Sequence, residues 1–473
     1  MTSSRLEKYR VCIQVINLFL VLISPACFSH TGKDALALST VLKRVNECYP
    51  QILIARLEVT KAQGDYLSAL GKFDPNLNMK TRSQPAGGYI NNYTDNQINI
   101  PTLANGLKFF GGYRIGRGDW PVYYQNYLTN SGGEYRAGLT LPLLKDRLID
   151  KERAKLLTQA EKIEMNNQEV GATKIKIYQE AIRAYWQWVQ AGKQLTIFKQ
   201  LLNLAQERQK AIIKQASEGD LARLAIAENR QFIIQRQQLV NQGQMIFEQA
   251  AVNLSIYYRD ENNQPKYPME RQLPANLTSG SRTRQEYTTL ENQIRKHPIF
   301  CKLEKYYRII KLKQNLAKND LLPNLEATAY TFKQNGSGGD PLLIPQAAMV
   351  GLRFTFPLLQ REAKGKLITA TTELQQIATE KKFIFDKLKN ELTNLLISKK
   401  MYQKQVNLLT EELALAKQVQ AGETEKFYEG DSTLFLVNQR EQASTQVQLN
   451  LINSQVNLQQ TRDLIRFFSS TNL

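Results

Sequence analysis

The side chains best suited to metal binding or nucleophilic catalysis are few in this 473-residue chain and lie far apart. There are two histidines, His30 and His297, and four dispersed cysteines. A zinc site or a catalytic thiol needs its partners at short, regular spacings, and these residues show none. No nucleophile–base pair or carboxylate constellation stands out either. We therefore expect no catalytic, metal-binding or cofactor-binding residues, and a protein that is not an enzyme.

The charge pattern argues against a nucleic-acid binder. Lys and Arg total 62 against 43 Asp and Glu, which gives a formal charge of +19. The basic residues are scattered among Glu, Gln and Asn along helical stretches and form no single basic run, so they predict solvated helix surfaces. Hydrophobic residues make up 42% of the chain, which indicates a folded rather than a disordered protein.

Residues 1–30 have the pattern of a secretory signal peptide. Basic residues precede an apolar stretch at 11–23, and small residues follow at 24–26, where a signal peptidase cleaves. The stretch is too short for a membrane span, and no other apolar run reaches about eighteen residues. We expect an exported protein without a transmembrane helix. Cys27 follows Ala26 directly, so an alternative interpretation of this cleavage site is that of a lipoprotein, with Cys27 lipidated.

An internal duplication organises the rest of the chain. Pro50 and Pro298 lie 248 residues apart, each inside a predicted helix, at 36–72 and 290–318. Pro75 and Pro323 have the same offset, and each precedes an Asn-Leu pair that opens a predicted strand. Equal offsets in matching contexts indicate a repeat. We expect a first repeat at 31–258, a proline-containing linker at 259–284 and a second repeat at 285–473.

Each repeat is predicted to hold one β-hairpin, at 76–141 and 324–356. The second strand of each ends in a similar motif, at 138–144 and 351–359, where alternating residues reach a proline and run into a helix. The first hairpin carries a long polar loop, 85–133, which we interpret as an extracellular excursion. Strands of about ten alternating residues suit a membrane barrel. Four strands per chain cannot close one, so several chains would share it.

A long helix is predicted after each hairpin, over 145–217 and 360–428. Apolar residues recur there at steps of three and four without proline, which indicates coiled-coil helices about 100 Å long. Each ends at Glu-Gly-Asp, at 218–220 and 429–431, where glycine permits a left-handed turn and a second helix returns. The predicted fold is mixed α and β, mostly α, with two long helical hairpins.

Together these features resemble the TolC family of outer-membrane efflux proteins over about residues 36–468. The matching landmarks are the strand starts, the tip glycines and the arginines after the tips, at Pro75, Pro323, Gly219, Gly430, Arg230 and Arg440. The resemblance implies a homotrimer with one twelve-stranded barrel in outer-membrane lipid and a helical tunnel through the periplasm. It also implies a periplasmic adaptor, or membrane fusion protein, joined to an inner-membrane pump or ABC transporter in efflux or type I secretion.

The resemblance assigns two groups of site residues. The tips would dock the adaptor through Glu218, Gly219, Asp220, Leu221, Tyr428, Glu429, Gly430 and Asp431. A periplasmic aperture would be lined by Glu228, Asn229, Arg230, Asn438, Gln439 and Arg440. The family's acidic ring after the second tip is missing, because no carboxylate occupies the comparable positions Leu436, Asn438 and Gln439. The family's usual gate is therefore not predicted here.

Two other functions remain open at this point. A periplasmic coiled-coil adaptor or scaffold would have the long helices but no paired strands and no barrel. An exported hydrolase would need a catalytic constellation, and degradation of periplasmic or cell-wall material by the purified protein would reveal one.

Overall fold

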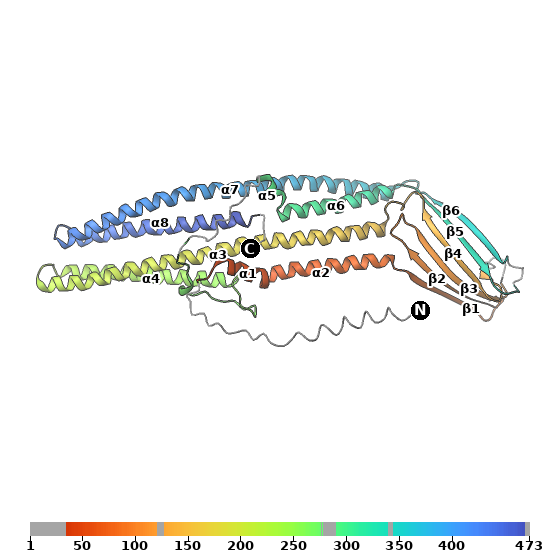
Figure 1. Cartoon of the computed structure of the whole chain (residues 1–473), viewed down its shortest axis with the longest axis horizontal. Helices are drawn as coiled ribbons and strands as arrows, with labels where there is room; N and C mark the ends of the chain where they lie inside the picture. Colours follow the sequence, from red (N-terminus) through yellow and green to blue (C-terminus); the bar gives the residue numbers. More distant parts are fainter. Residues whose placement is uncertain (1–34, 121–126, 276, 278–289, 339–343, 469–473) are drawn as a thin grey trace, which may run out of the picture. The chain divides into compact units, whose positions relative to one another are not determined.

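The computed structural model describes residues 35–120, 127–275, 277, 290–338 and 344–468. The predicted signal peptide, Cys27, His30 and part of the predicted linker lie outside these residues. From Leu36 onward the described residues form one unit of helices and a sheet (Figure 1). Its helices are α1 Leu38–Cys48, α2 Pro50–Leu70, α3 Lys151–Glu218, α4 Leu224–Ser255, α5 Leu290–Arg295, α6 Pro298–Asn319, α7 Arg361–Tyr428 and α8 Leu434–Arg466.

Local chemistry determines where these helices begin. Pro50 and Pro298 occupy the first positions of α2 and α6, where a missing backbone N–H costs no hydrogen bond. Asp150 caps α3, because its carboxylate accepts a hydrogen bond from the backbone N–H of Arg153 at 2.7 Å. The Thr433 hydroxyl caps α8 in the same way. These four helices thus start at residues suited to a first turn, whereas no side chain caps α7, whose N-cap residue is Gln360. The two prolines also divide the helices predicted over 36–72 and 290–318, because a proline inside a helix removes a hydrogen bond.

Among the described residues, six strands form a single antiparallel sheet. They are β1 Asn76–Gln84, β2 Asn91–Pro101, β3 Lys108–Gly118, β4 Glu134–Pro142, β5 Asn324–Gln334 and β6 Gln346–Thr355, and they lie in that order. The prediction of four strands per chain is therefore wrong, because β2 and β3 form an additional hairpin within the predicted loop 85–133. Paired strands also contradict the alternative of an adaptor without them.

The residue types of the additional hairpin explain why sequence patterns do not predict it. β2 is rich in Asn and Asp, which are poor strand formers, and four of the eleven residues of β3 are glycine. Each strand is nevertheless hydrogen-bonded to a neighbour on both sides. Pairing within the sheet supplies the stability that local propensity lacks.

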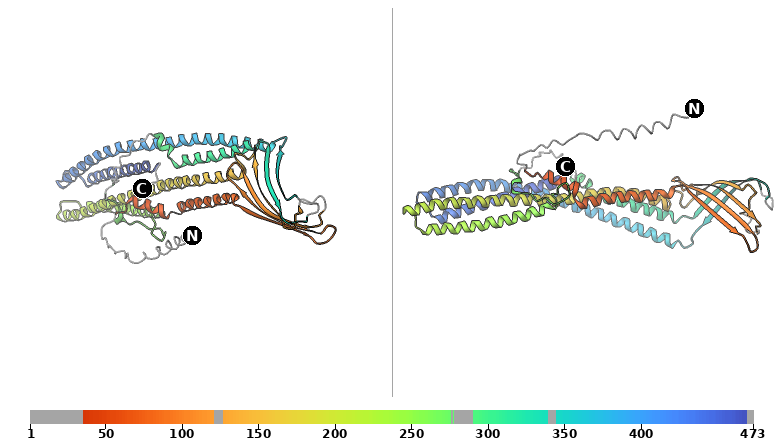
Figure 2. Two further views of the ribbon diagram at one scale, coloured as in Figure 1. Left: turned by 45° about the vertical axis from the view of Figure 1, so that its right-hand side comes forward. Right: turned by 90° about the horizontal axis from the view of Figure 1, so that it is seen from below.

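Four helices connect directly to the sheet. α2 leads towards β1, β4 into α3, α6 into β5, and β6 into α7. These helices pack in the order α2, α3, α6, α7. Further from the sheet α3 pairs with α4 and α7 pairs with α8, each as an antiparallel hairpin (Figure 2). The sheet lies at one end of α3 and α7, and the helix tips lie at the other.

The main hydrophobic core lies midway along α3, where α1, α4 and α8 pack against it. Tyr178, Trp188 and Leu195 are fully buried there. Beside them, Trp186 donates a hydrogen bond from Nε1 to the Asp463 carboxylate at 2.8 Å. The tryptophans therefore hold helices together.

Candidate functional site

The sheet carries apolar and polar side chains on opposite faces. The strand register places these residues on one side, the apolar face: Leu77, Met79, Ile98, Ile100, Phe109, Tyr135, Leu139, Leu141, Leu325, Val350, Leu352 and Phe354. The polar face carries alternate residues such as Asp95, Arg114 and Glu134. On β4, Tyr135 of the apolar face is 56% exposed, whereas Glu134 of the polar face is 5% exposed. Antiparallel sheets in water usually show the opposite pattern.

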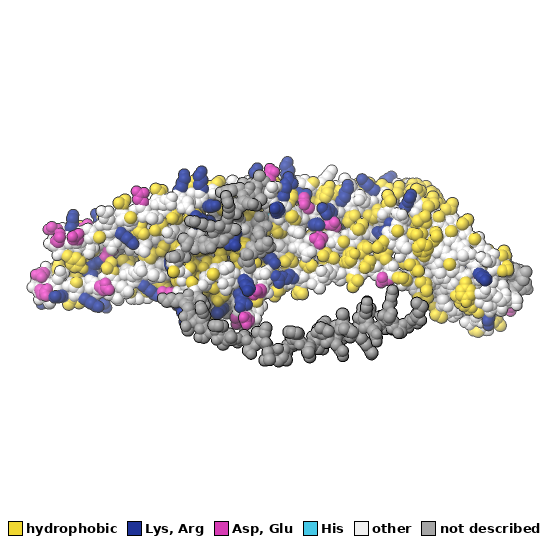
Figure 3. All heavy atoms as spheres, in the orientation of Figure 1, with side chains coloured by type: hydrophobic (Ala, Val, Ile, Leu, Met, Phe, Trp, Pro, Cys, Tyr) yellow, Lys and Arg dark blue, Asp and Glu magenta, His cyan; other side chains and the backbone are white. Residues whose placement is uncertain are grey.

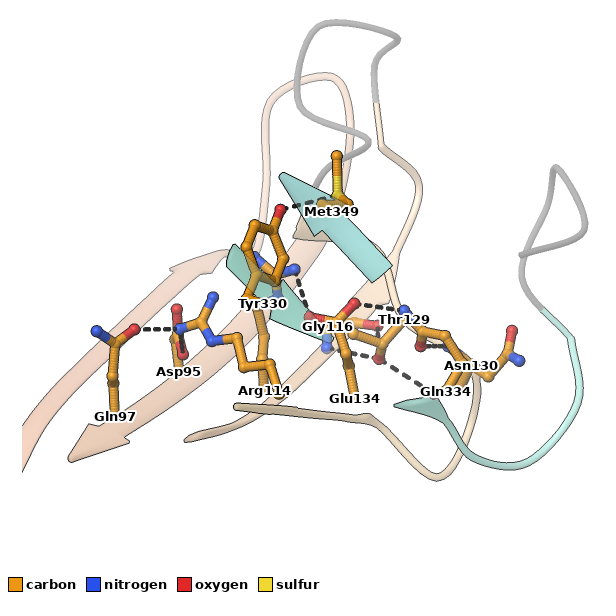
Figure 4. A network of polar contacts seen from close by, with 11 residues as sticks. Asp95, Gln97, Arg114, Gly116, Thr129, Asn130, Glu134, Tyr330, Gln334 and Met349 are labelled. Carbon is orange, nitrogen blue, oxygen red and sulfur yellow. Dashed lines mark hydrogen bonds and ion pairs between the residues drawn. The ribbon is translucent and has the colours of Figure 1, made fainter. Parts of the chain in front are cut away.

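An ordered network of charged and amide groups covers the polar face (Figure 4). Arg114 donates to Glu134 at 2.8 Å, and Glu134 also accepts from the Gln334 amide at 2.6 Å. Arg136 pairs with Asp95 and donates to Gln97 at 2.9 Å. These contacts join β2, β3, β4 and β5. Opposite charges facing each other across strands stabilise this arrangement of the sheet.

Aromatic side chains close the end of the polar face that lies away from the helices, here called the outer end. The Tyr127 ring stacks on Tyr93 with centroids 4.6 Å apart, and Trp120 packs beside both rings. Thr129 accepts a hydrogen bond from the Gly116 N–H at 3.0 Å. A side chain at Gly116 would collide with the Tyr127 carbonyl, since its Cβ would lie 2.0 Å away. Residues 127–129 therefore lie directly on the polar face.

At the other end of the polar face, the sheet and helices surround a cavity of about 1460 Å³. Polar groups from both sides line it, including Gln97, Asn99 and Thr140 from the sheet. Several of the basic residues that line the cavity are paired with acids. Lys145 lies 3.3 Å from Asp320, and a second lysine, Lys366, lies 2.7 Å from Glu362. The lining of the cavity is therefore mixed, with apolar groups among seven basic and seven acidic side chains and no excess of either charge.

A band of exposed hydrophobic side chains marks the level where the helices meet the sheet (Figure 3). The junction band comprises Leu67, Leu77, Leu144, Leu148, Leu322, Phe354, Phe356, Leu358 and Leu359, all of them exposed. So large a group of apolar side chains in water would be costly, so this surface needs an apolar environment or a partner.

The predicted docking residues lie at the two helix tips. Gly219 and Gly430 have φ of 92° and 84°, in the left-handed region that favours glycine. Leu221 is half-buried, and the other seven predicted tip residues are exposed. Apolar side chains next to the tips are exposed as well, at Leu224, Tyr428 and Phe435. The tips therefore combine acidic and apolar groups on an accessible surface.

The six predicted aperture residues divide into two sets. Asn229 and Asn438 are 0% and 1% exposed within a single chain, so they contact other helices and present no side chain to an opening. Asn229 donates to the Ala205 carbonyl at 3.1 Å. We therefore remove both asparagines from the aperture and assign them to helix packing. The remaining four lie nearer the surface, where Glu228 is half-buried and the others are exposed: Arg230, Gln439 and Arg440.

A buried ion network joins the two helical hairpins near the tips. Glu441 on α8 is paired with Arg208 of α3 and with Arg236 of α4, the latter at 2.6 Å. Asn438 accepts a further hydrogen bond from Arg236 at 2.8 Å. Burial lowers the pKa of Arg236 to about 10, because the charged form loses its hydration. One carboxylate thus holds two arginines from the other hairpin.

The sequence predictions missed this network, although a signal for it exists. Leu434, Val437, Val447 and Leu451 follow the buried stripe of α8, and Glu441 falls within the same stripe. A charged residue at a core position of a helix requires a buried partner. Only the structure identifies the two arginines as those partners.

Groups capable of chemistry are sparse among the residues that the structure describes. No cluster of three or more His, Cys, Asp or Glu is placed there to hold a metal ion. Cys48 and Cys301 are free thiols. Burial lowers the pKa of His297 to about 4, and its Nδ1 accepts a hydrogen bond from the backbone N–H of Ile299 at the start of α6.

No helix in the described part of the chain combines the length and the apolar character needed to cross a membrane.

Solved outer-membrane channels share this fold. VceC from Vibrio cholerae aligns with 91% of this chain and 96% of its own, with a TM-score of 0.63 and 14% identity. The open-state channel MtrE from Neisseria gonorrhoeae aligns with 93% and 91%, at a TM-score of 0.63 and 14% identity. CmeC from Campylobacter jejuni aligns with 91% and 85%, at a TM-score of 0.60 and 13% identity. No protein-family model and no curated protein matches the chain.

These similarities confirm the predicted TolC-like fold. Identities this low establish a common architecture and leave function to be argued from the residues.

Proposed function

We propose that three copies of this chain close one outer-membrane channel, which passively conducts cargo from an inner-membrane transporter in tripartite efflux or type I secretion. The observation that carries this proposal is the sheet with its exposed apolar face and covered polar face. Such a sheet suits a barrel wall with lipid outside and water inside. The shared fold of VceC and MtrE supports the same conclusion. No step of such transport requires a catalytic residue.

The sheet edges support an assembly of several copies. β1 and β6 end the sheet, so one side of each has no strand partner among the residues that the structure describes. Unpaired backbone groups are not tolerated in hydrocarbon, so β6 of one copy would pair with β1 of the next. Further along the chain, α7 exposes Met401, Leu408 and Leu415 at steps of seven residues. This is coiled-coil spacing, and a neighbouring copy would cover it.

The tips are the surface that we assign to a periplasmic adaptor. They lie at the end of α3 and α7 away from the sheet, where Leu224 and Phe435 are exposed beside the acidic turns (Figure 1). An amphipathic helical partner would cover these apolar groups and contact the acidic residues with basic side chains. Lipidation of Cys27 remains a separate prediction.

Extraction from outer membranes followed by electron microscopy tests the channel directly. We expect trimeric particles with a barrel at one end and a helical tunnel at the other. A monomer in the soluble fraction, or particles without a barrel, would overturn the proposal.

Substitution of the tip glycines tests adaptor docking separately. Gly219→Leu and Gly430→Leu place a bulky side chain at positive φ and should distort the turns. We expect at least a tenfold loss of export with normal trimer yield. Gly422→Leu is the control, because Gly422 lies within α7 with open space around it. Normal export from both tip variants would show that the partner binds elsewhere.

A further inference from the structure

We infer that the hairpin of β2 and β3 is part of the barrel wall, so that each copy contributes six strands and three copies close a barrel of eighteen. This inference rests on the proposed channel function. It makes the barrel about as wide as the helical tunnel beneath it. The middle of the barrel then imposes no constriction. The size of the cargo is limited instead by the outer end of the barrel and by the helix tips.

The first argument is that the hairpin follows the two-faced pattern of the other strands. Ile98, Ile100 and Phe109 lie on the apolar face, and all three are exposed. Asp95 and Arg114 lie on the polar face and take part in its network. A polar loop in water would not need apolar and polar side chains on opposite faces. A barrel wall between lipid and water needs this separation.

The second argument comes from the turn between β2 and β3, at 102–107. It lies on the helix side of the sheet, next to the strand-to-helix junction after β4. Gly106 has a φ of 72°, and a Cβ at this position would lie 2.6 Å from both the Asp146 carbonyl oxygen and the Pro142 ring. Asp146 is itself fixed by two hydrogen bonds with Asn319, at 2.9 and 3.0 Å. The hairpin is thus built into the junction.

The third argument compares the widths of the two walls in one copy. Four helices of each copy, α2, α3, α6 and α7, connect to the sheet. Neighbouring helices pack about 8–10 Å apart, so four of them side by side span about 32–40 Å. Strands about 4.8 Å apart and tilted by about 40° each occupy about 6.3 Å of circumference. Six strands therefore span about 38 Å and match the helices. Four strands would span only about 25 Å.

The same spacings give the size of the lumen. Eighteen strands at this tilt close with a backbone diameter of about 36 Å, against about 24 Å for twelve. Side chains take up about 5 Å on each side of the lumen. The open diameter is then about 26 Å for eighteen strands and about 14 Å for twelve. The residues that pack on Tyr93 narrow the outer end of this space. The rest of the barrel continues the tunnel without a step.

Cysteine labelling in isolated outer membranes tests the placement of the hairpin. Gln97→Cys and Ile98→Cys are compared, with Cys48 and Cys301 changed to serine, using a charged, membrane-impermeant maleimide. We expect Gln97→Cys to react at least tenfold faster, because it faces the lumen and Ile98→Cys faces lipid. The matched controls lie on β4: Leu139→Cys on the apolar face and Thr140→Cys on the polar face.

The outcomes separate this inference from the channel proposal. Equal labelling at 97 and 98, with the β4 pair still tenfold apart, would place the hairpin outside the wall and overturn only the inference. Equal labelling within both pairs would remove lipid contact from the whole sheet and overturn the proposed channel as well.

Removal of the hairpin gives a second test by imaging. Deletion of residues 91–118 brings β1 next to β4 with their faces aligned, and Lys80 then stands opposite Glu134. We expect eighteen strands in the full chain and twelve in the deletion variant. A full-length barrel of twelve strands would overturn the inference, and this image decides the question even where the deletion variant does not assemble.

Discussion

The helical core and the sheet follow opposite patterns of burial. Midway along α3, Trp188 and Leu195 are fully buried. In the sheet Glu134 is buried, whereas Val350 is 87% exposed. Both patterns obey the hydrophobic effect if water surrounds the helices and hydrocarbon contacts the apolar face. The comparison shows that exposure within one copy has a different meaning in each region.

Trp188→Ala should have the largest effect on the helical core. Removal of a fully buried indole leaves a cavity among α3, α4 and α1, and we expect a loss of about 4 kcal/mol of stability. The denaturant midpoint of the extracted protein measures this loss. Leu408→Ala on exposed α7 is the control, and it should change the midpoint little in monomeric protein. Equal effects would contradict the location of the core.

Glu441→Ala tests the buried ion network that joins the two helical hairpins. It leaves Arg208 and Arg236 buried without their carboxylate, which should cost about 3 kcal/mol. The same measurement on Glu362→Ala serves as the control. Glu362 pairs with Lys366 at 2.7 Å and both side chains are exposed, so its loss should leave the midpoint nearly unchanged. A neutral result at Glu441 would mean that the network does not hold the hairpins together.

Val350→Arg tests the apolar face of the sheet. A charged side chain facing the middle of a bilayer costs about 2–4 kcal/mol in barrels, so assembly in the outer membrane should fall sharply. Gly351→Arg places the same side chain one residue along, on the polar face, where no atom lies within 4 Å. Quantifying assembled trimer in membranes compares the two. A loss at 351 with none at 350 would reverse the assignment of the faces.

Asp463→Asn should give the smallest effect, and one that depends on pH. Burial raises the pKa of Asp463 to about 6 from an ordinary value of 3.8. Between these values the unfolded chain loses the proton while the folded chain keeps it, so the contribution of Asp463 to stability falls as pH rises and is least favourable above pH 6. The variant should gain about 2 kcal/mol at pH 8 and almost nothing at pH 3. Midpoints at both pH values test this, and a gain of equal size at both would contradict it.

Sequence patterns predicted the parts of the fold that local chemistry determines. Glycine at positive φ in each tip and the three- and four-residue steps of α3 and α7 act within a few residues. The strand starts at Asn76 and Asn324 follow their prolines in the same way. Such signals do not depend on distant parts of the chain.

The parts that the sequence did not predict depend on partners far along the chain. The sequence of β2 is typical of a polar loop, because this segment becomes a strand only through pairing with β1 and β3. Arg208 and Arg236, which pair with Glu441, lie more than 200 residues before it in the sequence. Asn229 and Asn438 have polar side chains that suit an aperture, and only their burial shows that they pack between helices. No local pattern contains this information.

Spin-label accessibility along β5 tests the central claim most directly. Labels at residues 325–330, introduced one at a time in membrane-embedded protein, are compared for collisions with oxygen and with a water-soluble nickel complex. The two-faced sheet predicts a period of two, with oxygen favoured at Leu325, Ala327 and Ala329 and nickel favoured at the residues between them. Uniform access of the nickel complex, or the opposite phase, would contradict the assignment of this sheet to a channel wall.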